Sequence, residues 1–182
     1  MSAIQRLGVG RYATSTTEGT IQLGRALGEV LRAGDIVVLN GDLGAGKTQL
    51  TKGIAAALGA TTDVVSPTFT IQMVHEGTDV DLCHFDLYRL EDPEQLGDAG
   101  LLDAAGGDCV CVIEWGERFA DDIGPERLDV LLTKGEPPVD ALGCDDLIEV
   151  PRTIEFVACG SRAEEVVRSL DTHIMDSLSL SD

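Results

Sequence analysis

The sequence predicts a single α/β domain with buried parallel strands at its centre. Two short segments, residues 35–40 and 109–113, are almost wholly apolar, which is typical of strands covered on both faces of a parallel sheet. Apolar residues recur at helical intervals before and after the first of these segments. A length of 182 residues fits one such domain, which we place at residues 1–176, followed by a short polar tail at residues 177–182.

The N-terminal half is expected to alternate helix, strand and helix. Ser15-Thr-Thr-Glu18 has the spacing of a capping box and predicts the start of a helix that Gly34 terminates. The strand at residues 35–40 follows. A second amphipathic helix is expected from Thr48, with Gly59 at its C′ position.

The remaining elements combine strands with short helices. Residues 69–76 and 80–88 predict a β-hairpin around Gly77-Thr78, and Asp92-Pro-Glu94 predicts a short helix followed by loops. Further strands are expected at three segments, and a last helix is expected from Ser161. The strand segments are residues 109–113, 127–133 and 153–158, with a loop at residues 135–146.

Charge and cysteine content exclude several classes of protein. Thirteen Lys and Arg residues against 32 Asp and Glu residues give a net charge of −19, so nucleic acid and anionic membranes would be repelled. No apolar run approaches the roughly 20 residues of a membrane span, and the N-terminus has no signal-peptide segment, so we expect a cytoplasmic protein. Five cysteines without a C-x-x-C pair indicate free buried thiols.

The strongest motif is a phosphate-binding loop. Residues 41–48, Gly-Asp-Leu-Gly-Ala-Gly-Lys-Thr, match G-x-x-x-x-G-K-[ST], in which backbone amides and a helix N-terminus bind phosphates. Lys47 would reach the β- and γ-phosphates and Thr48 would bind Mg²⁺. The motif therefore predicts a nucleoside triphosphate and Mg²⁺ as cofactors. The expected nucleotide-binding residues here are Leu43, Gly44, Ala45, Gly46, Lys47, Thr48 and Gln49.

Three other segments supply candidate site residues. Glu114 directly follows a buried strand and is the expected second Mg²⁺ ligand, unless it is simply a solvated carboxylate. His84 and Asp86 share one face of their strand, where they either position water or the metal's outer shell, or lie on an exposed hairpin face. Thr68 in Ser66-Pro-Thr68 is a candidate sensor of the γ-phosphate, and Trp115 follows the metal carboxylate.

Other classes of nucleotide-binding protein fit less well. A regulatory GTPase needs an N-K-x-D motif, and the nearest segment, residues 133–136, lacks both the Asn and the Asp. A small-molecule kinase usually clamps the phosphoryl group with several arginines of a lid. Only Arg89 and Arg118 lie between the loop and residue 126, so a kinase is disfavoured but stays open.

Four segments together resemble the TsaE (formerly YjeE) family, P-loop ATPases of bacterial tRNA threonylcarbamoyladenosine synthesis. They come in the family's order, and the similarity covers roughly residues 14–170. The segments are residues 41–48, Val65-Ser-Pro-Thr-Phe69, His84-Phe-Asp-Leu-Tyr-Arg89 and Ile113-Glu-Trp115. The resemblance implies a P-loop NTPase-like three-layer fold with a mixed, mainly parallel central sheet and an inserted β-hairpin.

The resemblance also implies roles for single residues. Thr48 and Glu114 would bind Mg²⁺, Lys47 would bind the ATP phosphates, and Asp86 would support hydrolysis. Residues 66–69 would form a switch loop, and Thr17 would lie against the adenine. An ATP-contacting arginine near Arg152 cannot be aligned, because the loop at residues 135–146 is longer than the family minimum.

The implied activity is ATP hydrolysis within a complex. The chain would act with a TsaD-type transferase and a TsaB-type protein, and it would meet tRNA only indirectly. Hydrolysis by the chain alone is expected to be slow, because no arginine finger lies beside the loop. The alternative is a nucleotide-gated assembly factor whose hydrolysis is incidental.

Overall fold

The computed structural model describes residues 3–136 and 149–179. The strands are β1 (Ile4–Gly8), β2 (Arg11–Thr14), β3 (Ile36–Asn40), β4 (Gln72–His75), β5 (Asp81–Asp86), β6 (Cys109–Glu114), β7 (Arg127–Lys134) and β8 (Arg152–Cys159). The helices are α1 (Thr17–Gly28), α2 (Lys47–Ala57), α3 (Gln95–Asp98), α4 (Leu101–Ala104), the 3₁₀ helix η1 (Gly116–Phe119), α5 (Ala120–Ile123) and α6 (Ser161–Ser179).

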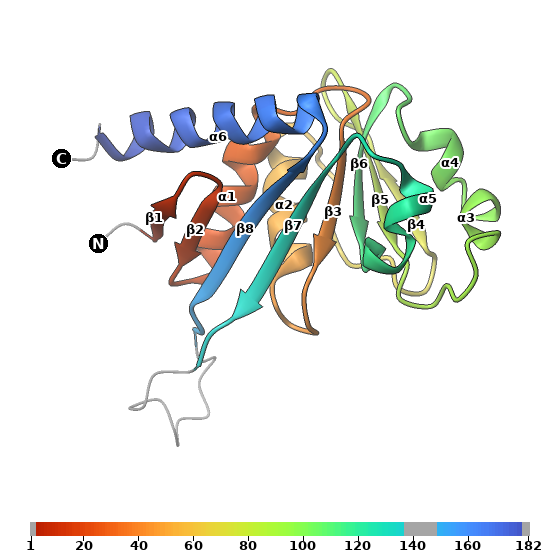
Figure 1. Cartoon of the computed structure of the whole chain (residues 1–182), viewed down its shortest axis with the longest axis horizontal. Coiled ribbons are helices and arrows are strands. Elements are labelled where there is room, and N and C mark those ends of the chain that lie inside the picture. The colour runs from red at the N-terminus through yellow and green to blue at the C-terminus, as the bar shows by residue number, and fades with distance from the viewer. Residues whose placement is uncertain (1–2, 137–148, 180–182) are drawn as a thin grey trace.

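All eight described strands form one sheet in the order β1-β2-β8-β7-β3-β6-β5-β4 (Figure 1). The four central strands, β7, β3, β6 and β5, are parallel to their neighbours within this group. Strands β3 and β6 are buried along nearly their whole length, as their apolar sequences predict. The carboxyl ends of the central strands therefore meet at one edge of the sheet.

Antiparallel pairs extend the sheet on both sides. Strands β4 and β5 form the predicted hairpin, although each is shorter than expected. On the other side β8 pairs with both β7 and β2, and β2 pairs with β1. The expected mixed sheet is confirmed, with its three parallel pairs at the centre and four antiparallel pairs around them.

Helices cover both faces of the sheet, which confirms the three-layer fold (Figure 1). On one face α1, α2 and α6 pack against the sheet through side chains such as Leu23, Leu50 and Leu170. On the other face the short helices α3 to α5 and η1 pack through Leu96 and Phe119. The sheet thus separates two apolar cores.

Helix α1 differs in detail from the sequence prediction. Its N-cap is Thr16, whose hydroxyl accepts a hydrogen bond from the Gly19 amide at 3.0 Å, so the predicted capping-box register is wrong by one residue. Ser15 instead belongs to the extended chain that follows β2, because its amide donates to the Ala3 carbonyl at 3.1 Å. The helix ends at Gly28, before the predicted stop at Gly34.

The N-terminal hairpin of β1 and β2 is absent from the sequence prediction. It is attached to α6 through Asp171, whose carboxylate accepts from Arg6 Nε at 2.8 Å and from the Tyr12 hydroxyl at 3.0 Å. Helix α6 includes residues 177–179, the first part of the predicted tail. Residues 180–182 and most of the predicted loop at 135–146 lie outside the described residues.

The helices and cysteines of the described part have the following properties. None of the helices in the described part is long and apolar enough to cross a membrane. The four cysteines among the described residues are free; Cys83, Cys109 and Cys111 are buried and Cys159 is half-buried. Burial is the main cause that raises the pKa of the Cys83 thiol to about 12, which makes it a poor nucleophile at neutral pH. Cys144 lies outside the described residues.

Candidate functional site: a phosphate-binding loop and two carboxylates

The predicted phosphate-binding loop connects β3 to α2 at the carboxyl edge of the parallel strands. Two glycines are needed for its path. Gly46 caps α2 with φ of +107°, and Gly41 has φ of +143°. A Cβ atom on Gly41 would lie 2.3 Å from the Leu132 carbonyl oxygen. The loop therefore lies directly against β7, and the first residues of α2, Lys47 and Thr48, line the pocket.

Lys47 lies folded over its own loop and is only 5% exposed. Its ammonium donates to the carbonyl oxygens of Gly41 at 2.6 Å and Asp42 at 3.1 Å, and lies 3.7 Å from the centroid of the Trp115 ring. Burial lowers the pKa of the Lys47 ammonium, and the nearby carboxylates, Glu114 first, oppose this shift. A phosphate in the loop would give this cation a stronger partner than two neutral carbonyls.

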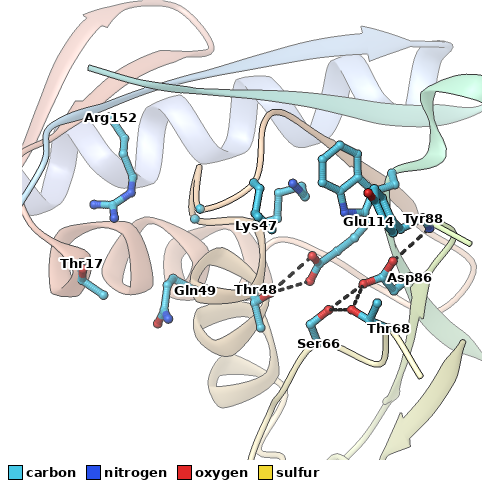
Figure 2. Close-up of a pocket in the computed structure, with 14 residues that line it drawn as sticks. Thr17, Lys47, Thr48, Gln49, Ser66, Thr68, Asp86, Tyr88, Glu114 and Arg152 are labelled. Atoms are coloured by element: carbon cyan, nitrogen blue, oxygen red, sulfur yellow. Dashed lines mark hydrogen bonds between the residues drawn. The ribbon is translucent and has the colours of Figure 1, made fainter. Parts of the chain in front are cut away.

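Glu114 is the last residue of β6 and lies beside the N-terminus of α2. The Thr48 hydroxyl donates to its two carboxylate oxygens, at 3.0 Å to Oε1 and 3.3 Å to Oε2 (Figure 2). The carboxylate is 3% exposed, so the alternative of a solvated side chain at a strand end does not apply. The structure therefore places the two predicted metal ligands in direct contact.

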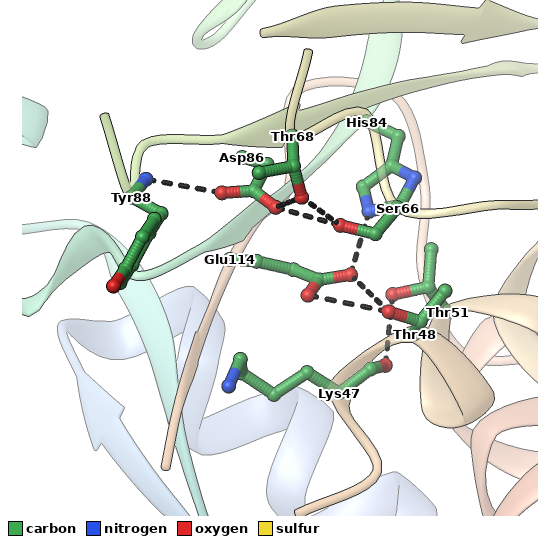
Figure 3. Close-up of polar contacts among 9 residues, drawn as sticks. All are labelled: Lys47, Thr48, Thr51, Ser66, Thr68, His84, Asp86, Tyr88 and Glu114. Atoms are coloured by element: carbon green, nitrogen blue, oxygen red, sulfur yellow. Dashed lines mark hydrogen bonds and ion pairs between the residues drawn. The ribbon is translucent and has the colours of Figure 1, made fainter. Parts of the chain in front are cut away.

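Asp86 ends the neighbouring strand β5 and is 2% exposed. The hydroxyls of Ser66 and Thr68 donate to its Oδ2 at 2.6 and 2.7 Å, and the Tyr88 amide donates to its Oδ1 at 3.0 Å (Figure 3). His84, on the same face of β5, is fully buried. The alternative of an exposed hairpin face for His84 and Asp86 is therefore wrong.

These groups surround a pocket of about 510 Å³, a volume typical of small-ligand sites. Thr17 and Arg152 lie at the end opposite Glu114 and Asp86 (Figure 2). Ala45 does not line the pocket, because its methyl group packs in the core. The lining residues are Thr17, Leu43, Gly44, Gly46, Lys47, Thr48, Gln49, Ser66, Thr68, Asp86, Tyr88, Glu114, Trp115 and Arg152.

Arg152 and Tyr88 are lining residues that the sequence analysis did not place in the site. Arg152 opens β8, and its Nε is a buried atom without a hydrogen-bond partner among the described residues. The strand register places Arg152 at the site. Strand β8 runs antiparallel to β7, with Arg152 opposite Lys134, so β8 begins at the edge where the parallel strands end. The Tyr88 ring packs against Trp115 with 5.2 Å between centroids.

The donor set suits a hard cation. Thr48 and Glu114 offer oxygen atoms, which Mg²⁺ prefers, and nucleotide sites commonly add phosphate and water oxygens to one or two protein ligands. Residues 3–136 and 149–179 contain no group of three His, Cys, Asp or Glu side chains that could hold a metal ion. The protein atoms therefore fit a magnesium ion shared with a nucleotide better than a metal held by protein alone.

Comparisons with known proteins show the family of the chain. The model of the family "Threonylcarbamoyl adenosine biosynthesis protein TsaE" matches residues 14–141. Among curated relatives, the tRNA threonylcarbamoyladenosine biosynthesis protein TsaE of Bacillus subtilis is 35% identical over 163 residues, 90% of this chain and 94% of the relative. The TsaE of Treponema pallidum is 42% identical over 113 residues, 62% of this chain and 83% of the relative.

A solved structure is also similar to this chain. The crystal structure of Bacillus subtilis YdiB superposes with a TM-score of 0.69 at 30% sequence identity, covering 93% of this chain and 97% of the other. The similarity in fold and the similarity in sequence both extend over most of the chain. The chain belongs to the TsaE family.

Proposed function

We propose that this chain binds ATP with Mg²⁺ and hydrolyses it as part of threonylcarbamoyladenosine biosynthesis in tRNA. The observation that carries the proposal is the convergence of Lys47, Thr48 and Glu114 on one pocket, in a chain of the TsaE family. Curated relatives are named for that biosynthesis. The geometry of the pocket supports the nucleotide chemistry, and membership of the family supports the pathway.

Each part of the pocket has a role in this proposal. The loop amides, the N-terminus of α2 and Lys47 bind the phosphates. Thr48 and Glu114 would hold Mg²⁺, which when bound supplies positive charge beside the phosphates. Thr17 and Arg152 lie at the opposite end of the pocket, where the nucleoside part of ATP would bind.

Asp86 is the residue proposed to orient the attacking water. Its carboxylate is buried at the same sheet edge as Glu114 and accepts hydrogen bonds from the hydroxyls of Ser66 and Thr68. A γ-phosphate in the pocket offers these hydroxyls competing acceptor oxygens. The loop that contains them would then move with the nucleotide state, as a switch loop does.

Partners are part of the proposal because of charge and arginine placement. A chain of net charge −19 is unsuited to binding tRNA alone, so we assign tRNA binding and the transfer step to TsaD-type and TsaB-type proteins in the cytoplasm. Arg152 is the only arginine among the described lining residues and lies away from Glu114. Hydrolysis by the chain alone is therefore expected to be slow.

The first experiment measures ATP hydrolysis by the purified chain, alone and with TsaB-type and TsaD-type proteins and unmodified tRNA. We expect stimulation by the partners that is lost in Lys47→Ala. Fast turnover without partners would contradict the proposed dependence. No stimulation, with ATP binding intact and active partners, would favour a kinase or an assembly factor.

A second experiment separates the ATPase from a nucleotide-gated assembly factor. Asp86→Asn is expected to bind ATP as before and to lose hydrolysis by about 100-fold or more, since an oriented base contributes about 10²–10⁴-fold. Loss of tRNA modification in cells carrying this variant supports the ATPase. Unchanged modification would show that hydrolysis is incidental.

A further inference from the structure

A histidine lies directly behind the proposed metal carboxylate. His84 Nε2 is 2.9 Å from Glu114 Oε1, and the two side chains are 0% and 3% exposed (Figure 3). In the parallel register of β5 and β6, His84 is opposite Val112, and Glu114 is the next residue of β6 on the same face. The contact is therefore fixed by the pairing of two buried strands.

The direction of this hydrogen bond follows from its partners. Glu114 Oε1 already accepts from the Thr48 hydroxyl at 3.0 Å, and an ionised carboxylate can only accept. His84 therefore donates to Glu114 from Nε2. Its other ring nitrogen, Nδ1, is buried without a hydrogen-bond partner among the described residues.

His75 of β4 lies beside the His84 ring. The two ring centroids are 6.1 Å apart, and His75 is 1% exposed. His75 is itself anchored, because its Nδ1 is 2.8 Å from the Thr62 hydroxyl. Burial, and then the neighbouring His84, lowers the pKa of His75. The His84 ring thus has buried neighbours on the side of β4 and on the side of Glu114.

We propose that His84 is a positioning residue, which holds the Glu114 carboxylate toward Thr48 and thereby sets the affinity of the site for Mg²⁺. This inference rests on the proposed function. When the Thr48 oxygen turns to a metal ion, its hydrogen bond to Glu114 is weakened. His84 is then the remaining described side chain that donates to Glu114.

The magnitude follows from other metal sites. Groups that hydrogen-bond a metal ligand orient it, and their loss typically reduces metal affinity by about 10–100-fold. The glutamate side chain has three rotatable bonds, so without His84 it can turn away from Thr48. Nucleotide binding without metal depends on the loop and Lys47, and is expected to be unaffected.

The test measures Mg²⁺ binding to the full chain saturated with ADP, by isothermal titration calorimetry. His84→Ala is expected to weaken Mg²⁺ binding by about 10–100-fold and to leave ADP binding in EDTA unchanged. His84→Gln keeps an N–H donor at a similar reach, and is expected to restore most of the affinity. Cys83→Ala, a buried truncation on the opposite face of β5, is the matched control and should bind Mg²⁺ as the wild type does.

Equal Mg²⁺ affinity in the wild type and His84→Ala would overturn the positioning role while leaving the proposed function intact. Failure of the wild type to bind Mg²⁺ with either ADP or ATP would overturn the proposed function itself. Nitrogen-15 NMR of the wild-type imidazoles gives a second measurement that needs no variant. A hydrogen on Nε2 of His84 supports the proposal, and a hydrogen on Nδ1 alone overturns it.

Discussion

Two glycines of the phosphate-binding loop differ in what surrounds them. Gly44 has φ of +76° and nothing within 4 Å of a Cβ position, whereas Gly41 has φ of +143° and the Leu132 carbonyl oxygen at 2.3 Å. Gly44→Ala is expected to lower the free energy of unfolding by about 1 kcal/mol, the cost of a left-handed non-glycine residue. Gly41→Ala adds a backbone clash and is expected to cost about 2 kcal/mol more.

Urea unfolding of both variants, followed by circular dichroism, checks this difference. Gly44→Ala serves as the control, because it carries the backbone cost without the clash. Equal destabilisation by the two substitutions would contradict the close packing of the loop against β7.

Single site residues were predictable where one motif fixes several roles. Lys47, Thr48 and Glu114 follow from the loop sequence and from the position of an acid after a buried strand. Arg152 does not, because its place depends on the pairing of β8 with β7 and on residues 137–148 between them. The position of Arg152 depends on the register between these two strands, which a single sequence does not reveal.

The start of α1 offers a prediction at the scale of one element. Thr16→Ala is expected to lower the free energy of unfolding by about 1 kcal/mol, because it removes the hydroxyl that accepts from the Gly19 amide. Ser15→Ala is the matched control and should change it by less than about 0.5 kcal/mol. Urea unfolding decides between them, and the reverse order would restore Ser15 as the cap.

The attachment of the N-terminal hairpin to α6 predicts an effect on stability and on its pH dependence. Hydrogen bonds from Arg6, and then from Tyr12, hold the pKa of the Asp171 carboxyl below its usual value. A lowered folded pKa means that this stabilisation is complete above about pH 4, the unfolded value, and is lost as the pH falls through the folded pKa. Asp171→Asn should therefore show a shallower loss of stability on acidification.

Thermal unfolding between about pH 5 and pH 2.5 checks the acid limb in the wild type and in Asp171→Asn. Tyr12→Phe is a milder variant, expected to cost about 1 kcal/mol at pH 7 because one buried hydrogen bond is lost. Identical acid profiles for the wild type and Asp171→Asn would remove Asp171 as a source of the pH dependence.

Elements were predictable in proportion to their local signals. Strands β3 and β6 and helix α2 have apolar patterns that specify them without tertiary context. Strands β1 and β2 are short and alternately buried, and their stability comes from β8 and Asp171. Such a hairpin is determined by contacts with residues over 130 positions away, which no local pattern contains.

At the scale of the whole molecule, charge predicts how the chain meets RNA. With 32 acidic and 13 basic residues, the isolated chain should bind tRNA more weakly than about 10⁻⁴ M, the weak limit of ordinary non-specific binding. A filter-binding titration at low salt, which favours electrostatic binding, is the most demanding check. Submicromolar binding by the chain alone would contradict the assignment of tRNA contact to partners.

The position of β8 has a consequence for synthesis of the chain. This strand lies between β2 and β7, so residues made first and residues made near the end become neighbours in the sheet. During synthesis the N-terminal hairpin cannot pair with the sheet until β8 has emerged from the ribosome. Because Arg152 is part of β8, the end of the pocket that Arg152 lines is completed last. A product truncated before β8 carries the whole phosphate-binding loop but an unfinished site.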